Sequence, residues 1–381
     1  MATLKSLAKT KNRSVLNRII DFFVNSKYRA YLVGGYVRDS TLGRKSVDID
    51  IVVEGDAVKV AKELNSKLHG SLSAHKEFGT ASITHKTGRI DLASARVERY
   101  SSPAELPHVY PSTIIEDLNR RDFSINAIAM SISRDNFGEI FDPFNGLQDI
   151  KSGVIRVLHK NSFIDDPTRI FRSLRYKNRF GFRIEKKTTE LMVDAVKGNM
   201  IKQLTGQRIL NEIRLIFSEA TYLATLHDIS DLKIFHVKKS DLERLSSLDS
   251  AGIYFYLSKL NTHKFPLTKE EKKIISDLRT IERTVSRLKK TDKNSTFYTI
   301  LSPLSEQAIR MIPLMYPELK NKFKIFSQLK KIKPLITGSD LKRLGYKPNK
   351  KFKSILKKVF NQQLDKKITT KKEAITFLKN Q

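Results

Sequence analysis

The chain of 381 residues has no cysteine, which excludes disulfide bonds, a disulfide-linked partner and metal sites built from thiolates. Its eight histidines are scattered, and no two of them have the spacing of a metal-binding pair. No apolar run approaches the length of a membrane span, and residues 1–11 lack the apolar core of a secretion signal. We therefore expect no membrane partner and a cytoplasmic location. The metal ions that suit such a chain are hard cations with oxygen ligands.

Acidic residues are scarce relative to basic ones: 40 Asp and Glu stand against 71 Lys and Arg, a formal net charge of +31. So large a positive charge favours binding to a polyanion, and nucleic acid is the first candidate. The alternative is an adaptation for solubility or habitat, which would spread the charge evenly. The excess is instead concentrated in residues 320–333 and 342–372, which favours nucleic acid.

The residue patterns predict an α+β protein with a small mixed-sheet head followed only by helices. A hydrophobic content of 40% over this length gives room for two to four compact units. In the head we expect helices at 15–24 and 57–68, strands at 30–33, 80–85 and 89–95, and a strand through Asp48 and Asp50. A proline-containing loop at 101–112 and a helix capped by Asp122 should follow. Later helices are expected at 166–180, 187–196 and 207–217.

Two acidic residues one position apart, Asp48 and Asp50, lie in the predicted strand shortly after the turn Gly34-Gly35. Side chains alternate along a strand, so both carboxylates project from one face. The glycines let the backbone approach a triphosphate, and a helix beginning near Val37 would point its free N–H groups at the phosphates. An isolated Asp-x-Asp is usually a solvated strand face, and an isolated Gly-Gly is usually a turn. Together, in an apolar setting where unpaired carboxylates are costly, they predict a metal and nucleotide site.

Three further residues are candidates for the same site. Asp91, on a later strand, would complete a centre in which two Mg²⁺ ions activate a 3′-hydroxyl and stabilise the leaving pyrophosphate, although it could be an ordinary exposed strand residue. Arg38 falls one turn into the predicted helix, where its guanidinium could bind a triphosphate through two N–H groups. Arg121 is the second such candidate, although arginine pairs such as Arg120-Arg121 often line solvated helix faces.

A stripe of polar residues follows Pro167 at helical spacing: Asp166, Arg169, Arg172 and Arg175. A carboxylate accepts a hydrogen bond from an exocyclic amino group, and a guanidinium donates to a ring nitrogen. Cytosine and adenine present that edge, whereas uracil and guanine present the reverse, so one Asp-Arg pair could admit C and A alone. The alternative is that Asp166 only caps the helix and pairs with Arg169, yet a carboxylate has enough lone pairs to cap and read at once.

These motifs, in this order, resemble those of the class II tRNA nucleotidyltransferases, the bacterial CCA-adding, A-adding and poly(A) polymerase group of the polymerase-β-like superfamily. The similarity extends over residues 31–217. Segment 32–39 is similar to the family's Gly-Gly-x-Val-Arg-Asp element, and 120–127 to its Arg-Arg-Asp-Phe-Thr-x-Asn-Ala element, with Ser124 for Thr. Segment 165–169 is similar to its Glu-Asp-x-x-Arg templating element, with Asp165 in place of Glu.

The resemblance implies that Asp48 and Asp50 hold two Mg²⁺ ions and that ATP or CTP is the substrate. The nucleotide-binding residues implied are Gly34, Gly35, Arg38, Arg121, Asp166, Arg169, Arg172 and Arg175. The implied domains are a catalytic head at 1–143, a neck with the nucleotide-selecting helix at 144–218, a body at 219–333 and a basic tRNA-binding tail at 334–381.

The expected activity is template-independent addition of the terminal A, or of C and A, to the 3′ end of tRNA. Full CCA addition and A addition are both open. A poly(A) polymerase, which would repeat A addition on many RNAs, is a close alternative. A non-catalytic RNA-binding protein is disfavoured because all three acids and the phosphate-binding arginines are present. A small-molecule nucleotidyltransferase is disfavoured by the net charge and the long helical extension.

Overall fold

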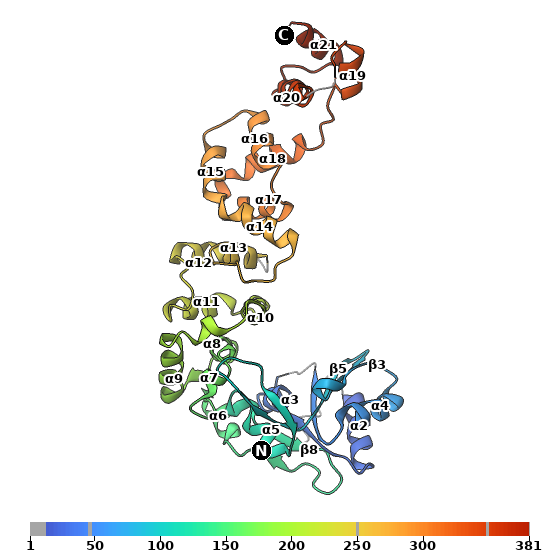
Figure 1. The fold of residues 1–381 in the computed structure, drawn as a ribbon, viewed down its shortest axis with the longest axis vertical. Helices are drawn as coiled ribbons and strands as arrows, with labels where there is room; N and C mark the ends of the chain where they lie inside the picture. The colour runs from blue at the N-terminus through green and yellow to red at the C-terminus, as the bar shows by residue number, and fades with distance from the viewer. Residues whose placement is uncertain (1–12, 45–47, 249–250, 348–349, 381) are drawn as a thin grey trace. The chain divides into compact units, whose positions relative to one another are not determined.

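The computed structural model describes residues 13–44, 48–248, 251–347 and 350–380. The chain divides into two compact units, residues 1–234 and 235–381 (Figure 1). The first unit contains every strand of the described chain, and the second is built from helices. None of the helices in the described part of the chain combines the length and apolarity needed to cross a bilayer.

A seven-stranded mixed sheet forms the head, with strand order β3-β4-β5-β2-β1-β8-β9. Its strands are β1 (Arg29–Val33), β2 (Ile49–Glu54), β3 (Ser71–His75), β4 (Thr80–His85), β5 (Gly88–Ser94), β8 (Ala129–Ser131) and β9 (Ile140–Phe141). Strands β2 and β5 run parallel, and every other neighbouring pair of this sheet is antiparallel. The parallel pair places Asp50 opposite Asp91 in register.

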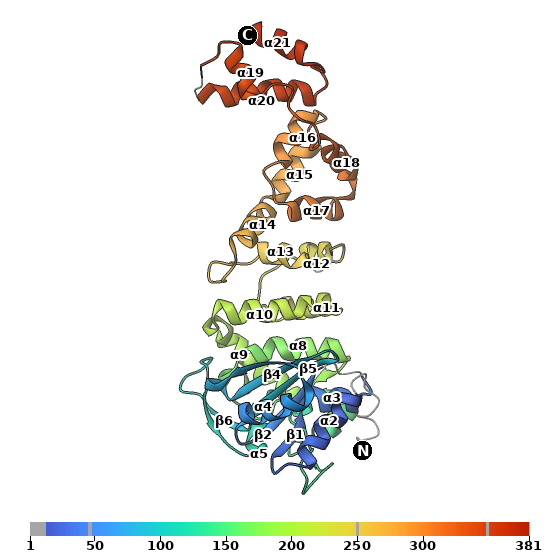
Figure 2. The same ribbon diagram turned by 90° about the vertical axis from the view of Figure 1, so that its right-hand side faces the viewer.

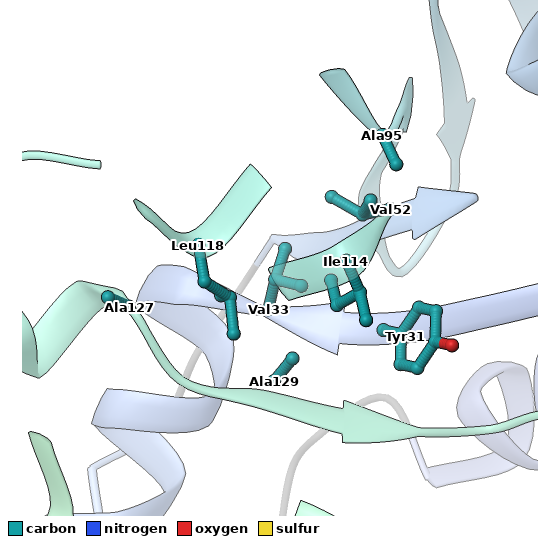
Figure 3. Close-up of a cluster of buried hydrophobic side chains, with 8 residues drawn as sticks. All are labelled: Tyr31, Val33, Val52, Ala95, Ile114, Leu118, Ala127 and Ala129. Atoms are coloured by element: carbon teal, nitrogen blue, oxygen red, sulfur yellow. The ribbon is translucent and has the colours of Figure 1, made fainter. Parts of the chain in front are cut away.

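One face of the sheet packs against helix α5 (Ile114–Asn119) through a cluster of buried apolar side chains (Figure 3). Tyr31 and Val33 project from β1 toward Ile114 and Leu118 of the helix (Figure 3). Because side chains alternate along a strand, Leu32 between them faces the other side, where it is fully buried. Helix α4 (Ala57–Leu68) packs against β3, β4 and β5 and against α2 (Arg13–Val24).

The remaining elements of the first unit complete the surroundings of the site. They are α3 (Gly34–Thr41), the ribbon of β6 (Arg96–Arg99) and β7 (His108–Pro111), α6 (Gly146–Ser152), the parallel pair β10 (Val154–Ile155) and β11 (Arg183–Ile184), α7 (Ser162–Asp165), α8 (Thr168–Phe180), α9 (Lys186–Lys197), α10 (Gly206–Phe217) and α11 (Tyr222–Asp231). Helix α8 lies between the sheet and α10 and contacts both α10 and α11 (Figure 2).

The second unit contains only helices among its described residues. They are α12 (Lys239–Leu245), α13 (Gly252–Ser258), α14 (Lys269–Arg279), α15 (Ile281–Lys289), α16 (Asn294–Leu301), α17 (Glu306–Met315), α18 (Lys320–Leu329), α19 (Gly338–Arg343), α20 (Lys350–Leu364) and α21 (Lys371–Lys379). The last three helices share a core of their own, which includes Leu341, Val359 and Leu378. Thr337 begins α19 with a capping box, in which its hydroxyl and the carboxylate of Asp340 each accept a backbone N–H.

Most predicted elements agree with the structure, with four differences. The strand expected through Asp48 and Asp50 begins only at Ile49, so Asp48 lies outside it. The helix expected after Asp122 is wrong: residues 124–126 form a short 3₁₀ turn that leads into β8, because the Asp122 carboxylate accepts from the N–H of Phe123 and the amide of Asn126 and closes a tight turn. The loop expected at 101–112 is wrong at its end, where β7 pairs with β6 and Pro111 occupies the last strand position. Helix α3 begins at Gly34, earlier than the expected start at Val37.

We predict that Gly146→Ala destabilises the head. A Cβ atom at Gly146, the first residue of α6, would lie 2.1 Å from the backbone oxygen of Ser124. Since backbone must move to relieve this contact, we expect a loss of at least about 1–3 kcal/mol in the free energy of unfolding, measured by urea denaturation. Gly338→Ala is the control, because its Cβ would meet nothing closer than 4.0 Å. Equal stability of the two variants would contradict the prediction.

Candidate active site

A cavity of about 460 Å³ opens in the first unit where the sheet meets α8. It is lined by Gly34, Gly35, Arg38, Asp50, Glu98, Tyr100, Arg120, Arg121, Asp122, Asn126, Asp166, Arg169, Arg172 and Tyr176. The structure thus brings together most of the residues predicted for the site, although they come from separate segments of the chain. Of the predicted residues, Asp48, Asp91 and Arg175 do not line this cavity.

The turn after β1 needs glycine because other side chains lie close to its backbone. Gly34 has φ +59°, and a Cβ atom there would lie 2.7 Å from Nη1 of Arg121. A Cβ at Gly35 would lie 3.6 Å from the carboxylate of Asp50 and 3.6 Å from the guanidinium of Arg38. The turn therefore leaves room for two arginines and an aspartate to meet around one point of the cavity wall.

Of the three predicted acids, only Asp50 lines the cavity, and Asp48 and Asp91 lie near enough for their charges to act on it. Asp50 is half-buried on β2, and burial raises the pKa of its carboxyl. The charge of Arg121 opposes this shift, whereas the charges of Asp91 and Asp48 add to it. Asp48 is exposed and precedes the strand, which begins at Ile49. The carboxylate of Asp91 accepts hydrogen bonds from the hydroxyl of Ser82 and from Nε of Arg89. Its role as a further catalytic acid stays a prediction.

The donor set fits a hard divalent cation only in part. No three carboxylate or imidazole groups among the described residues converge as a complete protein-only metal site would require. Magnesium in phosphoryl-transfer sites is usually held by one or two carboxylates together with water and substrate phosphates. Asp50, with like charges nearby and a raised pKa, would be relieved of repulsion by such an ion. The residues that would hold it are Asp48 and Asp50.

Arg38 is held rigidly against the cavity wall. Its Nε donates to Asp39 at 2.9 Å and its Nη1 to Oδ1 of Asn126 at 2.5 Å, and only 4% of the residue is exposed. The guanidinium also lies 5.3 Å from the ring of Tyr176 and 4.7 Å from that of Phe180, which adds cation–π attraction. Since these contacts fix the side chain in one place, the charge is positioned before any anion arrives.

The arginine pair at 120 and 121 is anchored by one buried acid. Asp117 accepts from Arg120 at 2.6 Å and from Arg121 at 2.9 Å. Burial alone would raise the pKa of the Asp117 carboxyl, but the two guanidinium groups outweigh it and hold that pKa below its usual value. Arg121 also donates to the backbone oxygen of Asn126 at 3.4 Å, which directs it to the glycine turn.

Asp166 has a partner that the sequence pattern did not indicate. Its Oδ1 accepts from the N–H of Thr168 at 2.9 Å, from the hydroxyl of Thr168 at 2.5 Å and from Nη2 of Arg208 on α10 at 2.6 Å. Arg208 also donates to the backbone oxygen of Ala104 at 2.6 Å. The ion pair between Asp166 and Arg169 that the spacing suggested is not formed in the described part of the chain. No described residue donates to the second carboxylate oxygen of Asp166, Oδ2.

Arg169 and Arg172 extend from the same face of α8 but are held differently. Arg169 donates to the hydroxyl of Ser162 at 2.7 Å and to the backbone oxygen of Arg120 at 2.8 Å. Arg172 donates from Nε to Oδ2 of Asp122 at 2.8 Å and from Nη2 to the hydroxyl of Tyr176 at 3.0 Å. Burial alone would raise the pKa of Asp122, yet Arg172 and the amide of Asn126 lower it to about 2.

Arg175 is placed away from the nucleotide cavity. It is 5% exposed and forms ion pairs with Glu219 at 3.2 Å and Glu212 at 3.7 Å, both from the α10 side. The Arg175 guanidinium lies 5.6 Å from the ring centroid of Tyr176, and Tyr176 itself lines the cavity. These contacts favour a positioning role in place of the predicted direct contact with the nucleotide.

Six residues that line the cavity are not among the predicted site residues: Glu98, Tyr100, Arg120, Asp122, Asn126 and Tyr176. Glu98 accepts from Arg96 at 3.1 Å, from Arg120 at 3.0 Å and from the hydroxyl of Tyr100 at 3.0 Å. Burial, with the charge of Glu98 added, raises the pKa of Tyr100. Arg96, Glu98 and Tyr100 alternate along β6 and its extension, so a period-two polar pattern was the available signal.

Comparison with known proteins shows the family. Residues 30–156 match the family described as the poly A polymerase head domain. An A-adding tRNA nucleotidyltransferase of Halalkalibacterium halodurans is 31% identical over an alignment that covers 95% of this chain and 91% of that protein. The chain belongs to the class II tRNA nucleotidyltransferase family. It is therefore an enzyme, as the motifs predicted.

Other members of the family give the same result. An A-adding tRNA nucleotidyltransferase of Aquifex aeolicus is 34% identical over 84% of this chain, although the match spans only 43% of that longer protein. A CCA-adding enzyme in an apo form has a TM-score of 0.82 and 31% identity, covering 98% of this chain and 97% of its own. The Thermotoga maritima CCA-adding enzyme in complex with tRNA has a TM-score of 0.75 and 29% identity, covering 99% and 98%. The predicted α+β fold of this tRNA nucleotidyltransferase is confirmed.

We predict that Asp122→Asn destabilises the enzyme at neutral pH by roughly 2 kcal/mol, since the pKa of this carboxyl falls from 3.8 to about 2 on folding. A depressed pKa stabilises the fold above the unfolded pKa and ceases to do so as pH falls through the folded one. The deficit of the variant should therefore shrink between about pH 4 and pH 2, in urea titrations at each pH. Asp135→Asn, at an exposed position, is the control and should change stability by less than about 0.5 kcal/mol. A deficit that persists unchanged at low pH would contradict the assignment.

Proposed function

We propose that this enzyme adds the terminal A to tRNA that ends in CC, without a nucleic-acid template. The observation that carries the proposal is one cavity that places the glycine turn, Arg38 and Asp50 together with Asp166 and Arg169. The first group suits a triphosphate and the second suits the edge of a base. A single nucleoside triphosphate spanning both would be held at each end.

The proposed chemistry is attack of the RNA 3′-hydroxyl on the α-phosphate of the nucleotide, with release of pyrophosphate. Arg38 and Arg121 bind the phosphate oxygens next to the glycine turn, where both guanidinium groups are already fixed by Asn126. Two Mg²⁺ ions, held by Asp48 and Asp50, would lower the pKa of the hydroxyl and neutralise charge on the leaving group. The protein's contribution is positioning and charge stabilisation.

Base selection follows from the hydrogen bonds of Asp166 and Arg169. Within the described residues, all the donors to Asp166 use Oδ1, so Oδ2 can accept from the exocyclic amino group of adenine or cytosine. Arg169 donates to Ser162 and to Arg120 from its two terminal nitrogens, which leaves further N–H groups for a ring nitrogen. Uracil and guanine would place a carbonyl acceptor opposite the Asp166 carboxylate and an N–H donor opposite the Arg169 guanidinium, so neither hydrogen bond could form.

The relatives support A addition, with addition of CCA as the alternative. One relative that aligns over nearly the whole chain is named an A-adding tRNA nucleotidyltransferase. Proteins named multifunctional CCA protein match only about half of it, for example 54% for that of Xanthomonas axonopodis. Solved CCA-adding enzymes with TM-scores of 0.80 and 0.79 to this chain are complexes with ATP and with CTP. The same Asp-Arg pair accommodates either base.

The deciding experiment supplies the enzyme with tRNA that lacks its 3′ end, or ends in C or in CC, with ATP and CTP separately, and counts the nucleotides added. We expect efficient addition of one A to the CC end. Failure to extend that end with ATP, while C is added to the shorter ends, would overturn the proposal. Continued addition of A beyond one residue would instead identify a poly(A) polymerase.

We also propose the division into a head at 1–143, a neck at 144–218, a body at 219–333 and a tail at 334–381. The separate core of α19, α20 and α21 supports the tail as a module. Its charge supports tRNA binding, since residues 334–381 contain 13 Lys and Arg against three acidic residues.

We predict that Asp50→Asn abolishes nucleotide addition while tRNA affinity stays nearly unchanged, because basic surface elsewhere supplies most RNA binding. Mutation of a residue that only supports a metal ligand typically lowers activity by about 10–100-fold. Loss of a metal ligand itself should therefore lower the rate of nucleotide addition by more than about a hundredfold. The variant should also melt at a higher temperature than the wild type, because burial disfavours the charge at this position. Asp48→Ala should be inactive as well. An active Asp50→Asn enzyme would remove the metal assignment.

We predict that Arg169→Ala relaxes discrimination against UTP and GTP more than it lowers the rate with ATP, since a site that reads a base edge rejects mismatches through unpaired polar groups. Ser162→Ala removes one hydrogen bond that fixes Arg169 and should act in the same direction but more weakly. The exposed Arg183, changed to Ala, is the control. Single-turnover rates with each of the four nucleotides provide the test, and equal losses for all four would show that Arg169 is structural.

A further inference from the structure

A second cleft, of about 710 Å³, lies within the second unit between α16 and α20. Its apolar wall is formed by Tyr298, Pro303, Pro334, Ile336, Leu356 and Phe360. Nothing in the chemistry proposed above uses this cleft, which is built from residues of a different unit from the nucleotide cavity. Its volume is within the range of sites for small organic groups.

The walls of the cleft are held in place by specific contacts. The side chain of Asn294 donates to the backbone oxygen of Leu364 at 3.1 Å, and Ser295 donates to the carboxylate of Asp365 from its N–H at 2.8 Å and its hydroxyl at 2.7 Å. The rings of Tyr298 and Phe360 meet edge to face with centroids 5.4 Å apart. These bonds tie α16 to α20, so the cleft is formed before any ligand binds.

Four polar side chains of this cleft have no protein partner within the described part of the chain. No hydrogen bond or ion pair to another described residue is made by the Tyr298 hydroxyl, the Asn361 side-chain amide or the ammonium groups of Lys353 and Lys357. The two lysines are exposed and lie one turn apart on α20. A largely apolar cleft that is also lined by a hydroxyl and an amide without protein partners among the described residues, and by two cations, is equipped for a ligand that combines a flat ring with negative charge.

We propose that this cleft binds an unstacked nucleobase of the RNA substrate. The base would stack on Phe360 or Tyr298, its edge would bond to Asn361, and the flanking phosphates would lie against Lys353 and Lys357. Charge complementarity favours RNA over an apolar peptide, because the surrounding residues 334–381 are strongly basic. The inference rests on the proposed function in one respect, since it takes the RNA to be tRNA.

A tryptophan reporter tests base stacking directly. The chain contains no tryptophan, so Phe360→Trp gives a protein with a single indole in the cleft. The probe is full-length enzyme titrated with tRNA ending in CC, and heparin serves as a polyanion without bases. We expect tRNA to quench the indole fluorescence by stacking and heparin to leave it unchanged. Phe352→Trp, at a partly buried position that packs against the core of the tail outside the cleft, is the matched control and should respond to neither.

The outcomes separate this inference from the proposed function. If Phe360→Trp enzyme extends the tRNA with A but shows no quenching, or is quenched equally by heparin, the cleft does not hold a base and the inference is overturned while the function stands. If the wild-type enzyme neither binds nor extends tRNA, the proposed function fails and the inference falls with it.

A charge-matched pair of variants tests the binding of phosphates by the two lysines. The double variant Lys353→Gln/Lys357→Gln should lower the slope of log affinity for tRNA against log salt by about two units, roughly one for each phosphate that is no longer neutralised. Lys358→Gln/Lys372→Gln removes the same charge from exposed positions that do not line the cleft and should lower the slope by less than one unit. Equal slopes for the two double variants would show that Lys353 and Lys357 act only through the overall positive charge of the protein. That result would overturn their assignment as phosphate-binding residues.

Discussion

The buried carboxylate of Asp122 joins the two halves of the nucleotide cavity, and the geometry of the site depends on it. One oxygen accepts from Arg172 on α8, and the other accepts from the backbone of Phe123 and the amide of Asn126. Asn126 in turn accepts from Arg38 on α3. A single negative charge therefore orients one arginine from the sheet side and one from the helix side. Without it, Arg172 would lose its carboxylate partner, and Asn126 would lose the acceptor that holds its amide group in place beside Arg38.

The cavity carries more positive charge than its own acids balance, and aromatic rings help to hold the surplus. Asp117 serves both Arg120 and Arg121, while Tyr176 lies 5.3 to 5.6 Å from three guanidinium groups. A ring face attracts a cation without neutralising it. Arginines arranged in this way keep their places in the free enzyme and still have charge to offer a triphosphate. The free energy needed to order these side chains is supplied when the protein folds, so it does not reduce the binding free energy of the nucleotide.

Local patterns allowed much of the fold to be predicted, together with eight of the fourteen residues that line the cavity. Alternation identified the strand of Asp50, and the signals of a capping acid, a proline and a terminal glycine identified α8 and its end at Gly181. What failed depended on distant partners. Arg208 is 42 positions from Asp166, and no local spacing indicates that it shares an oxygen with the helix cap. The segment after Asp122 looked helical because its competing side-chain hydrogen bonds cannot be read from apolar spacing.

The parallel pairing of β2 and β5 sets how this enzyme can tolerate insertions. Asp50 and Asp91 occupy the same rung of the ladder, and their neighbours Ile51, Ile90 and Leu92 are fully buried. A shift of one residue in β5 would turn every side chain of that strand to the opposite face and would place Ile90 or Leu92, in place of Asp91, opposite Asp50. Insertions within β2 or β5 would therefore break this register, whereas extra residues in the connections between strands, such as that between β4 and β5, would leave the pairing of Asp50 with Asp91 intact.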